Sequence, residues 1–280
     1  MSAGGVSIRL SREIRFSIDR DWVLGAHGAE GFEHALPVTN SWGGWPSAVG
    51  ISPYLTLRIE VSGIPNPTTG YLVNIRELDL LMRLHAIPLA ARLLDAEGVR
   101  LTGVELVRGV RDAIASGVPA HCRLESLRLS TTPFLSYAIQ ESEPNMVELT
   151  QCFEFSASHR LHVPTLSDDD NRRIFGKCNN PRGHGHNYQL EVTIADAANP
   201  APSLPLPEFE ARVKRAVIDR LDHKHLNEDV PEFATVNPSV ENIARVVWGL
   251  LGNHLQPAKL RRVRVWETAK TYAEYAGEEM

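Results

Sequence analysis

The sequence has few cysteines, no basic excess and no long apolar run, and each absence excludes a class of protein. Its three cysteines, Cys122, Cys152 and Cys178, are too few and too widely spaced to form a disulfide framework. A net charge of -5 without a basic stripe argues against a nucleic-acid partner. No apolar run is long enough to cross a bilayer, so we expect no membrane partner.

The first residues, 1–5, also lack the basic and apolar regions of a secretory signal peptide. Together with the sparse cysteines, this favours a reduced, cytoplasmic setting, which suits a reactive thiol or a metal site. The chain has 280 residues, of which 43% are hydrophobic. This length is enough for two domains, each with its own core.

Short segments of the first half are echoed, in the same order, in the second half. Three pairs match in this way: 15–18 with 154–157, 54–60 with 188–194, and 127–132 with 263–268. A polar stretch over 141–145 separates the two series. We therefore predict a duplicated fold, with one half over 1–143 and the other over 147–280.

The hydrophobic pattern of each half predicts the order strand, strand, helix, helix, strand, strand. In the second half it predicts strands near 150–159, 186–195, 261–267 and 271–276, and helices near 207–220 and 239–254. In the first half it predicts helices over 74–94 and 103–116. Strands that flank a helix pair favour an α+β fold, in which an antiparallel four-stranded sheet carries two helices on one face.

The segment 175–188 brings one thiol and two imidazoles close together in sequence. His184 and His186 are two residues apart, so both imidazoles project from one face if the following strand begins at His184. Zinc enzymes commonly use three protein ligands and leave a fourth position open. His159, at the end of the preceding strand, is our candidate for the third ligand, and His162 is its rival.

Three further groups carry reactive side chains. Cys178 lies on the loop before His184, where cationic neighbours or a bound metal would favour its thiolate form; alternatively, it is a small buried loop residue. Asp222 and His223 are adjacent and suit a proton relay, although an ordinary charged helix terminus has the same composition. Glu267 follows a strand and could accept paired N–H groups from a heterocycle, or be merely solvated.

Taken together, these residues resemble the 6-pyruvoyltetrahydropterin synthase family, which includes the 6-carboxytetrahydropterin synthases. Five segments carry the resemblance: 155–161, 176–188, 221–227, 237–242 and 266–268. The family has the tunnelling fold (T-fold), which agrees with the strand and helix order above. The resemblance further implies a homo-oligomeric ring with active sites near subunit or domain boundaries.

The resemblance also implies a role for each candidate residue. His159, His184 and His186 would bind Zn2+, Cys178 would be the general base, and Asp222 with His223 would assist proton transfer. Glu267 would anchor the pterin ring. The implied reaction is a lyase step that converts 7,8-dihydroneopterin triphosphate to a tetrahydropterin with loss of triphosphate.

Two departures from the family pattern qualify this expectation. The second half has a proline-rich detour over 195–202 in place of the family's usual turn. In the first half, the repeat alignment puts Arg20 or a near neighbour at the place of His159. It puts Gly50 at that of His184, Ser52 at that of His186, and Thr131 at that of Glu267. The first half is therefore expected to be a degenerate, non-catalytic copy.

Three functions remain open at this point. Five residues separate Cys178 from His184, a spacing that favours the pyruvoyl-forming enzymes. A 6-carboxytetrahydropterin synthase of 7-deazaguanine and queuosine biosynthesis, or an enzyme for a smaller or dephosphorylated pterin, is the second candidate. The third is a pterin-binding scaffold without turnover, which would not need the full set of reactive side chains.

Overall fold

The structure, a computed structural model, describes residues 6–18, 43–48, 50–95, 102–197 and 202–277. The chain divides into two compact units. Unit 1 comprises residues 1–149 with 197–201, and unit 2 comprises 150–196 with 202–280. The division falls inside one long strand, β5 (Val147–His159). In the described ranges, no helix is both long and apolar enough to cross a membrane.

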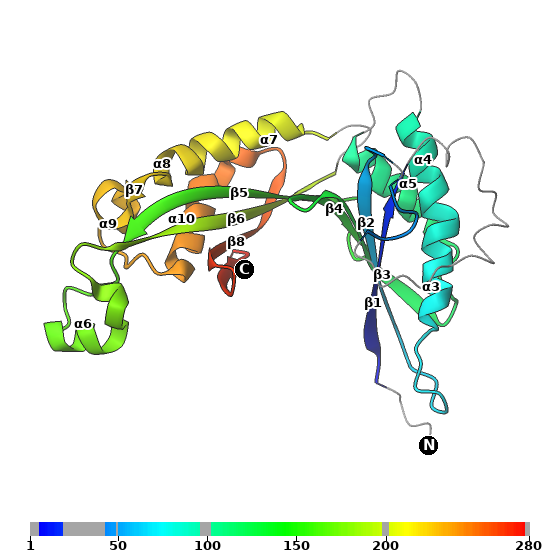
Figure 1. Cartoon of the computed structure of the whole chain (residues 1–280), viewed down its shortest axis with the longest axis horizontal. Coiled ribbons are helices and arrows are strands. Elements are labelled where there is room, and N and C mark those ends of the chain that lie inside the picture. The colour runs from blue at the N-terminus through cyan, green and yellow to red at the C-terminus, as the bar shows by residue number, and fades with distance from the viewer. Residues whose placement is uncertain (1–5, 19–42, 49, 96–101, 198–201, 278–280) are drawn as a thin grey trace. The chain divides into compact units, whose positions relative to one another are not determined.

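Unit 1 is an antiparallel sheet with helices on one face (Figure 1). Its strands lie in the order β1 (Ile8–Ser17), β2 (Tyr54–Gly63), β3 (Cys122–Thr132) and β4 (Leu135–Gln140), and each pairs antiparallel with the next. Its helices are α3 (Ile75–Leu81), η1 (Met82–Ala86), α4 (Ile87–Asp95) and α5 (Gly103–Ala115). The segment η1 is a π-helical turn that joins α3 to α4.

Unit 2 has the same kind of layering (Figure 1). Its strand order is β5, β6 (His184–Asp196), β8 (Lys259–Thr268) and β9 (Thr271–Tyr275), and the short β7 (Lys224–His225) pairs parallel with β5. Its helical segments are α6 (Asp168–Phe175), η2 (Gly176–Asn179), α7 (Leu206–Val213), η3 (Lys214–Ile218), α8 (Asp219–Leu221), α9 (Leu226–Asp229), η4 (Pro231–Phe233), α10 (Val240–Leu251) and η5 (Gly252–Leu255).

The core of unit 2 follows from two periodicities in the sequence. Every second residue of β6 from Tyr188 to Ile194 is buried on one face, because successive side chains of a strand point to opposite faces, and Thr193 and Ala195 are buried as well. Helix α10 begins after Ser239, whose hydroxyl accepts the Asn242 N–H at 3.5 Å, and it buries residues at helical spacing. The two elements contribute the following buried apolar side chains: Tyr188, Leu190, Val192, Ile194, Ala195, Val240, Ile243, Ala244, Val247, Leu250 and Leu251.

The α+β class with an antiparallel sheet and helices, predicted from the sequence, is confirmed. Helix α6 and strand β7 are among the elements that the sequence analysis did not predict. The chain between His159 and His184 was expected to contain a loop that carries Cys178, and it also includes helix α6. Its N-cap Ser167 accepts the N–H of Asp170 at 3.1 Å, and three aspartates occupy its first turn, so the capping pattern was readable. Strand β7 has only two residues, too few for an alternation to show.

Candidate functional site

Three strands deliver four potential metal ligands to one place in unit 2. His159 is the last residue of β5, His184 and His186 lie at the start of β6, and Glu267 lies near the end of β8. One ligand atom from each of these residues lies within 4.8 Å of the others. Because β6 lies between β5 and β8, strand ends far apart in sequence become neighbours here.

The side chains meet because they share one face of the sheet. His184 and His186 alternate in step with the buried Tyr188, so they continue the inward-facing row of β6. His159 continues the buried row of Phe155 and Ala157 on β5 and is itself 0% exposed. The strand therefore does begin at His184, as the shared face of the two imidazoles requires.

The distances within the cluster fit a bound cation. The Nε2 atoms of His159 and His184 are 3.1 Å apart. Glu267 Oε1 lies 3.3 Å from His159 Nε2 and 3.5 Å from His186 Nε2. His184 Nδ1 and His186 Nε2 are buried without a hydrogen-bond partner in the described part of the chain. Converging lone pairs and a carboxylate repel one another unless a cation lies between them, so this donor set suits a metal.

One contact outside the cluster fixes the tautomer of His159. Its Nδ1 lies 2.7 Å from the carbonyl oxygen of Pro238, so Nδ1 carries the proton and donates. The Nε2 lone pair is then left facing His184 and Glu267, as a metal ligand needs. Burial lowers the pKa of His159 from 6.5 to about 4, so the ring is neutral at physiological pH. Burial, followed by the nearby His186, also lowers the pKa of His184.

The depressed pKa of His159 predicts a pH-dependent stability of the metal-free protein. Between about pH 6.5 and pH 4 the unfolded chain binds a proton at His159 that the folded chain does not, so the free energy of unfolding falls as the pH is lowered through this range. Urea unfolding of the metal-free protein at several pH values measures this slope. His159→Gln should flatten it, and an unchanged slope in that variant would contradict the assignment.

Two hydrogen bonds of Asn237, which we call the Asn237 clamp, position the Pro238 carbonyl next to His159. The side-chain oxygen of Asn237 accepts the backbone N–H of His162 at 3.1 Å. Its backbone oxygen accepts the side-chain N–H of Asn242, in α10, at 2.9 Å. The segment that carries Pro238 is thereby fixed to both the helix layer and the chain that follows β5.

Loss of this clamp should weaken metal binding. Asn237→Ala removes the acceptor for His162 N–H and loosens the carbonyl that orients His159, and partners of this kind are typically worth about 10- to 100-fold in metal affinity. Competition with a metallochromic chelator measures the affinity. Asn253→Ala, in η5 outside the cluster, is the matched control and should bind metal as the wild type does. Equal affinity in both variants would contradict a role for the clamp.

The thiol of Cys178 lies on the 3-10 turn η2, which is attached to the chain just after His159. The Leu161 N–H donates to the Cys178 carbonyl at 2.9 Å. The side-chain oxygen of Asn179 accepts Arg160 Nε–H at 2.9 Å and lies 3.2 Å from His162 Nδ1. His162 therefore belongs to this hydrogen-bond network and lies outside the histidine cluster. Of the two candidates for the third metal ligand, His159 is the one that lies in the cluster.

Asp222 and His223 attach to Ser156, near the C-terminal end of β5. Asp222 Oδ1 accepts the Ser156 N–H at 2.8 Å, and Oδ2 lies 2.9 Å from His223 Nδ1. These two contacts, the Ser156 N–H first, lower the pKa of Asp222. His223 has φ of 57°, and no other described residue except glycine has a positive φ. Backbone strain of this kind is concentrated at functional sites.

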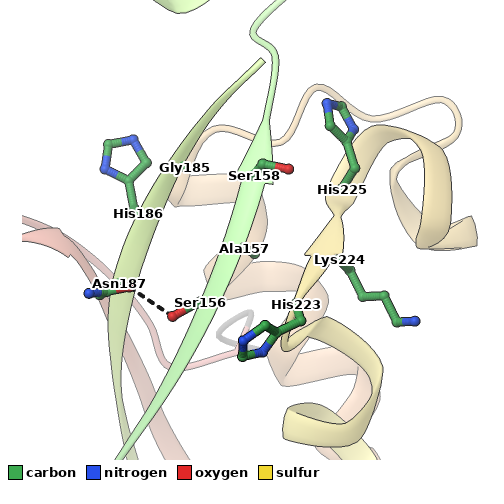
Figure 2. Close-up of a pocket in the computed structure, with 9 residues that line it drawn as sticks. All are labelled: Ser156, Ala157, Ser158, Gly185, His186, Asn187, His223, Lys224 and His225. Atoms are coloured by element: carbon green, nitrogen blue, oxygen red, sulfur yellow. Dashed lines mark hydrogen bonds between the residues drawn. The ribbon is translucent and has the colours of Figure 1, made fainter. Parts of the chain in front are cut away.

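A pocket of about 420 Å³ lies beside the cluster and is shown in Figure 2. His186 projects from β6, whereas His223 and His225 come from the segment on the other side of β5. Ser156 forms the floor between them and donates to Asn187 at 2.7 Å. His223 and His186 both line this pocket, although the His186 ring points away from Ser156 and Asn187.

The remaining candidates differ in their surroundings. Within the described part of the chain, the Cys178 thiol makes no hydrogen bond to Asp222 or His223. Cys152 lies 3.8 Å from Glu191, and burial raises the pKa of its thiol to about 11, which suits an inert residue. All three cysteines are free. Sequence reasoning missed the Pro238 carbonyl and the side chain of Asn179, because a backbone acceptor and a lone asparagine carry no motif of their own.

Comparison with known proteins identifies a family that unit 2 matches. The family model for 6-pyruvoyl tetrahydropterin synthase matches residues 148–278. The human 6-pyruvoyl tetrahydrobiopterin synthase is 41% identical over 133 residues, which cover 47% of this chain and 92% of that protein. The 6-carboxy-5,6,7,8-tetrahydropterin synthase of Haemophilus influenzae is 28% identical over 152 residues, covering 46% and 99%.

A solved structure is also similar to part of this chain. The 6-pyruvoyl tetrahydropterin synthase of Caenorhabditis elegans is 34% identical, with a TM-score of 0.45, and the match covers 48% of this chain and 96% of that one. These relatives are therefore matched over nearly their full length by about half of this chain.

Proposed function

Because the chain belongs to the 6-pyruvoyl tetrahydropterin synthase family, we propose that unit 2 is a zinc-dependent lyase. Its substrate would be 7,8-dihydroneopterin triphosphate, and its products a 6-pyruvoyl tetrahydropterin and triphosphate. The observation that carries this proposal is the convergence of His159, His184, His186 and Glu267 in the half that the family model matches. Cys178 and the Asp222–His223 pair attach to the same strand, β5, or to the residues that follow it.

The relatives favour pyruvoyl chemistry over the carboxy product. Identity to the human pyruvoyl enzyme is 41%, against 28% for the carboxy enzyme of Haemophilus influenzae. The five residues between Cys178 and His184 support the same choice. A 6-carboxytetrahydropterin synthase is the second candidate, since enzymes of that name are also relatives of this chain.

The metal would be held by His159, His184 and His186. Three imidazoles leave a coordination position open, which is the usual arrangement of a catalytic zinc. When bound, Zn2+ would act as a Lewis acid toward the hydroxyl and developing carbonyl oxygens of the substrate side chain. Glu267 Oε1 is close enough to these histidines to be a fourth ligand. We assign it instead to the pterin ring, whose paired N–H groups suit a carboxylate.

The proton transfers would be carried out by the remaining side chains. Cys178, as thiolate, would remove a carbon-bound proton from the substrate side chain, and His223 would return a proton at another carbon. Asp222 would hold the His223 imidazole in the required tautomer through the 2.9 Å contact to Nδ1. Its own carboxylate is held by the Ser156 N–H, so the pair is fixed to the sheet.

We further propose that unit 1 is a second, degenerate T-fold copy. Matching irregularities support this. The β2–β3 register shifts at Glu60/Val61 and the β6–β8 register at Thr193/Ile194. The β3–β4 and β8–β9 registers shift in the same way near the following turn. The first long helix of each unit also contains a five-residue π-helical turn, η1 in unit 1 and η3 in unit 2. Independent folds would have no reason to share these features.

If the bulges of the two units are equivalent, the sequence-based repeat shifts by one residue in β2. Buried Leu55 then matches buried Tyr188, whereas the original match of exposed Tyr54 to Tyr188 puts a surface residue in a core position. Ile51 and Pro53 replace Gly50 and Ser52 as the counterparts of His184 and His186. Thr131 remains the counterpart of Glu267, and Arg20 lies outside the described residues. None of the described counterparts is a metal ligand, which supports a non-catalytic unit 1.

The proposed function is tested by product analysis. Purified full-length protein loaded with Zn2+ should release triphosphate from 7,8-dihydroneopterin triphosphate and form the 6-pyruvoyl product, identified by mass spectrometry. Formation of the 6-carboxy product would support the second candidate. Binding of the pterin without release of triphosphate would contradict both and support a scaffold.

A further inference from the structure

The turn that carries Cys178 holds its own side chains only weakly. It is the 3-10 segment η2, which has four residues, and the hydrogen-bond geometry of such a turn is poor. The bond that closes it, from the Asn180 N–H to the Lys177 carbonyl, is long, at 3.3 Å. The place of the Cys178 thiol is therefore set by contacts that reach η2 from other parts of the chain.

Those contacts come from the three residues that follow His159. The Leu161 N–H donates to the Cys178 carbonyl at 2.9 Å, and Arg160 Nε–H donates to Oδ1 of Asn179 at 2.9 Å. Arginine can only donate, so the accepting atom of Asn179 is its oxygen. His162 Nδ1 lies 3.2 Å from the same oxygen and therefore donates to it as well. One amide side chain, 8% exposed, thus receives two of the three bonds.

The donor side of this contact is itself fixed. Asn227, in α9, binds the backbone of Arg160 in both directions: its amide oxygen accepts the Arg160 N–H at 2.8 Å, and its amide N–H donates to the Arg160 carbonyl at 3.0 Å. These bonds follow directly on the parallel pairing of β5 with β7, which ends at Ser158 and His225. The Arg160 side chain therefore reaches Asn179 from a backbone that is held in the sheet.

We propose that Asn179 is a positioning residue, which fixes the place of Cys178 relative to His159 through its bonds to Arg160 and His162. This inference rests on the proposed function for the role of Cys178 as the base. Asn179 is nearly buried, so it acts through the neighbouring thiol rather than on the substrate. A base removes a carbon-bound proton only at close range, and a displacement of about 1 Å costs on the order of 10²-fold in rate.

Asn179→Ala tests the proposal in the zinc-loaded, full-length protein. Steady-state triphosphate release should show a kcat lowered about 10- to 100-fold, with KM and zinc content unchanged. Asn179→Asp keeps an acceptor oxygen for Arg160 Nε–H and should restore kcat to within several-fold of the wild type. Asn66→Ala is the matched control, because Asn66 also accepts two N–H groups, at 2.9 and 3.1 Å, but lies in unit 1. It should keep the wild-type kcat.

A double-variant cycle tests whether Asn179 acts through Arg160. Arg160→Met removes the Nε–H donor but leaves the backbone bonds to Asn227. It should lower kcat about as much as Asn179→Ala does, and the variant with both changes should be no slower than either alone. Additive losses, or an unchanged kcat in Asn179→Ala, would overturn the proposal. If Asn179→Ala fails to fold, Arg160→Met carries the test, and an unchanged kcat there would overturn it equally.

Alkylation by iodoacetamide separates this proposal from the proposed function, because it needs no turnover. Cys178 should be alkylated several-fold faster in Asn179→Ala than in the wild type, since the turn is loosened, whereas the rate at Cys122 in unit 1 should not change. Mass spectrometry of the peptides measures both rates. If this holds but the wild type releases no triphosphate, the proposed function is contradicted and the hold of Asn179 on Cys178 is retained. If the wild type is active and both kcat and alkylation are unchanged in Asn179→Ala, the positioning role alone is contradicted.

Discussion

Cys178→Ala should lower turnover of 7,8-dihydroneopterin triphosphate by about 10²- to 10⁴-fold, because it removes the proposed general base. The alanine side chain fits where the thiol was, since the Cys178 side chain makes no hydrogen bond in the described part of the chain. Its backbone carbonyl still accepts the Leu161 N–H, so the η2 turn should persist. Binding of substrate and metal should be unchanged, and the loss should fall on kcat rather than on KM.

Cys152→Ala is the matched control for this prediction. Cys152 lies in the same unit, but burial raises the pKa of its thiol to about 11, so it carries little thiolate at neutral pH. Steady-state triphosphate release by both variants, with metal content measured on the same samples, makes the comparison. Full activity in Cys178→Ala would show that the base lies elsewhere.

His184→Ala should prevent metal binding and strongly lower activity. It leaves two imidazoles and removes the partner that lies 3.1 Å from His159 Nε2. Loss of a catalytic metal removes several kcal/mol of transition-state stabilisation, on the order of a 10³-fold decrease in rate. Elemental analysis of the purified variant and the triphosphate-release assay measure the two effects.

Glu267→Gln separates the two roles open to that carboxylate. If Glu267 anchors the pterin, the variant should keep its metal and show a raised KM. Loss of metal comparable to that in His184→Ala would instead make Glu267 a ligand. Glu267 and His184 lie in the same cluster of unit 2, so the two variants are compared in the same structural surroundings.

The sequence was most informative where chemistry depends on local spacing. His184 and His186 share a face because side chains alternate along a strand. Strand β6 begins at His184, as this prediction required. For His159 the sequence predicted only a position at the end of a strand. Whether that strand end lies next to His184 and His186 depends on the order of the strands in the sheet. The choice of His159 over His162 depended on three-dimensional geometry, in which a contact to Asn179 draws His162 into a different network.

Other parts of the site could not be predicted because they depend on contacts distant in sequence. The Pro238 carbonyl orients His159 across 79 residues, and Asp222 is held by Ser156 across 66. The one-residue shift that we propose for the β2 repeat has a similar cause: a bulge changes the register, and short apolar echoes fit equally well on either side of it. Helix α6, in contrast, was overlooked although its Ser167 cap was visible.

The central claim is that this chain carries its fold twice and its chemistry once. The metal content of the purified full-length protein tests it most directly, by elemental analysis against a protein concentration from amino-acid analysis. We predict about one zinc per chain, lost in His184→Ala. A ratio near two, or one zinc that remains in His184→Ala, would contradict the account.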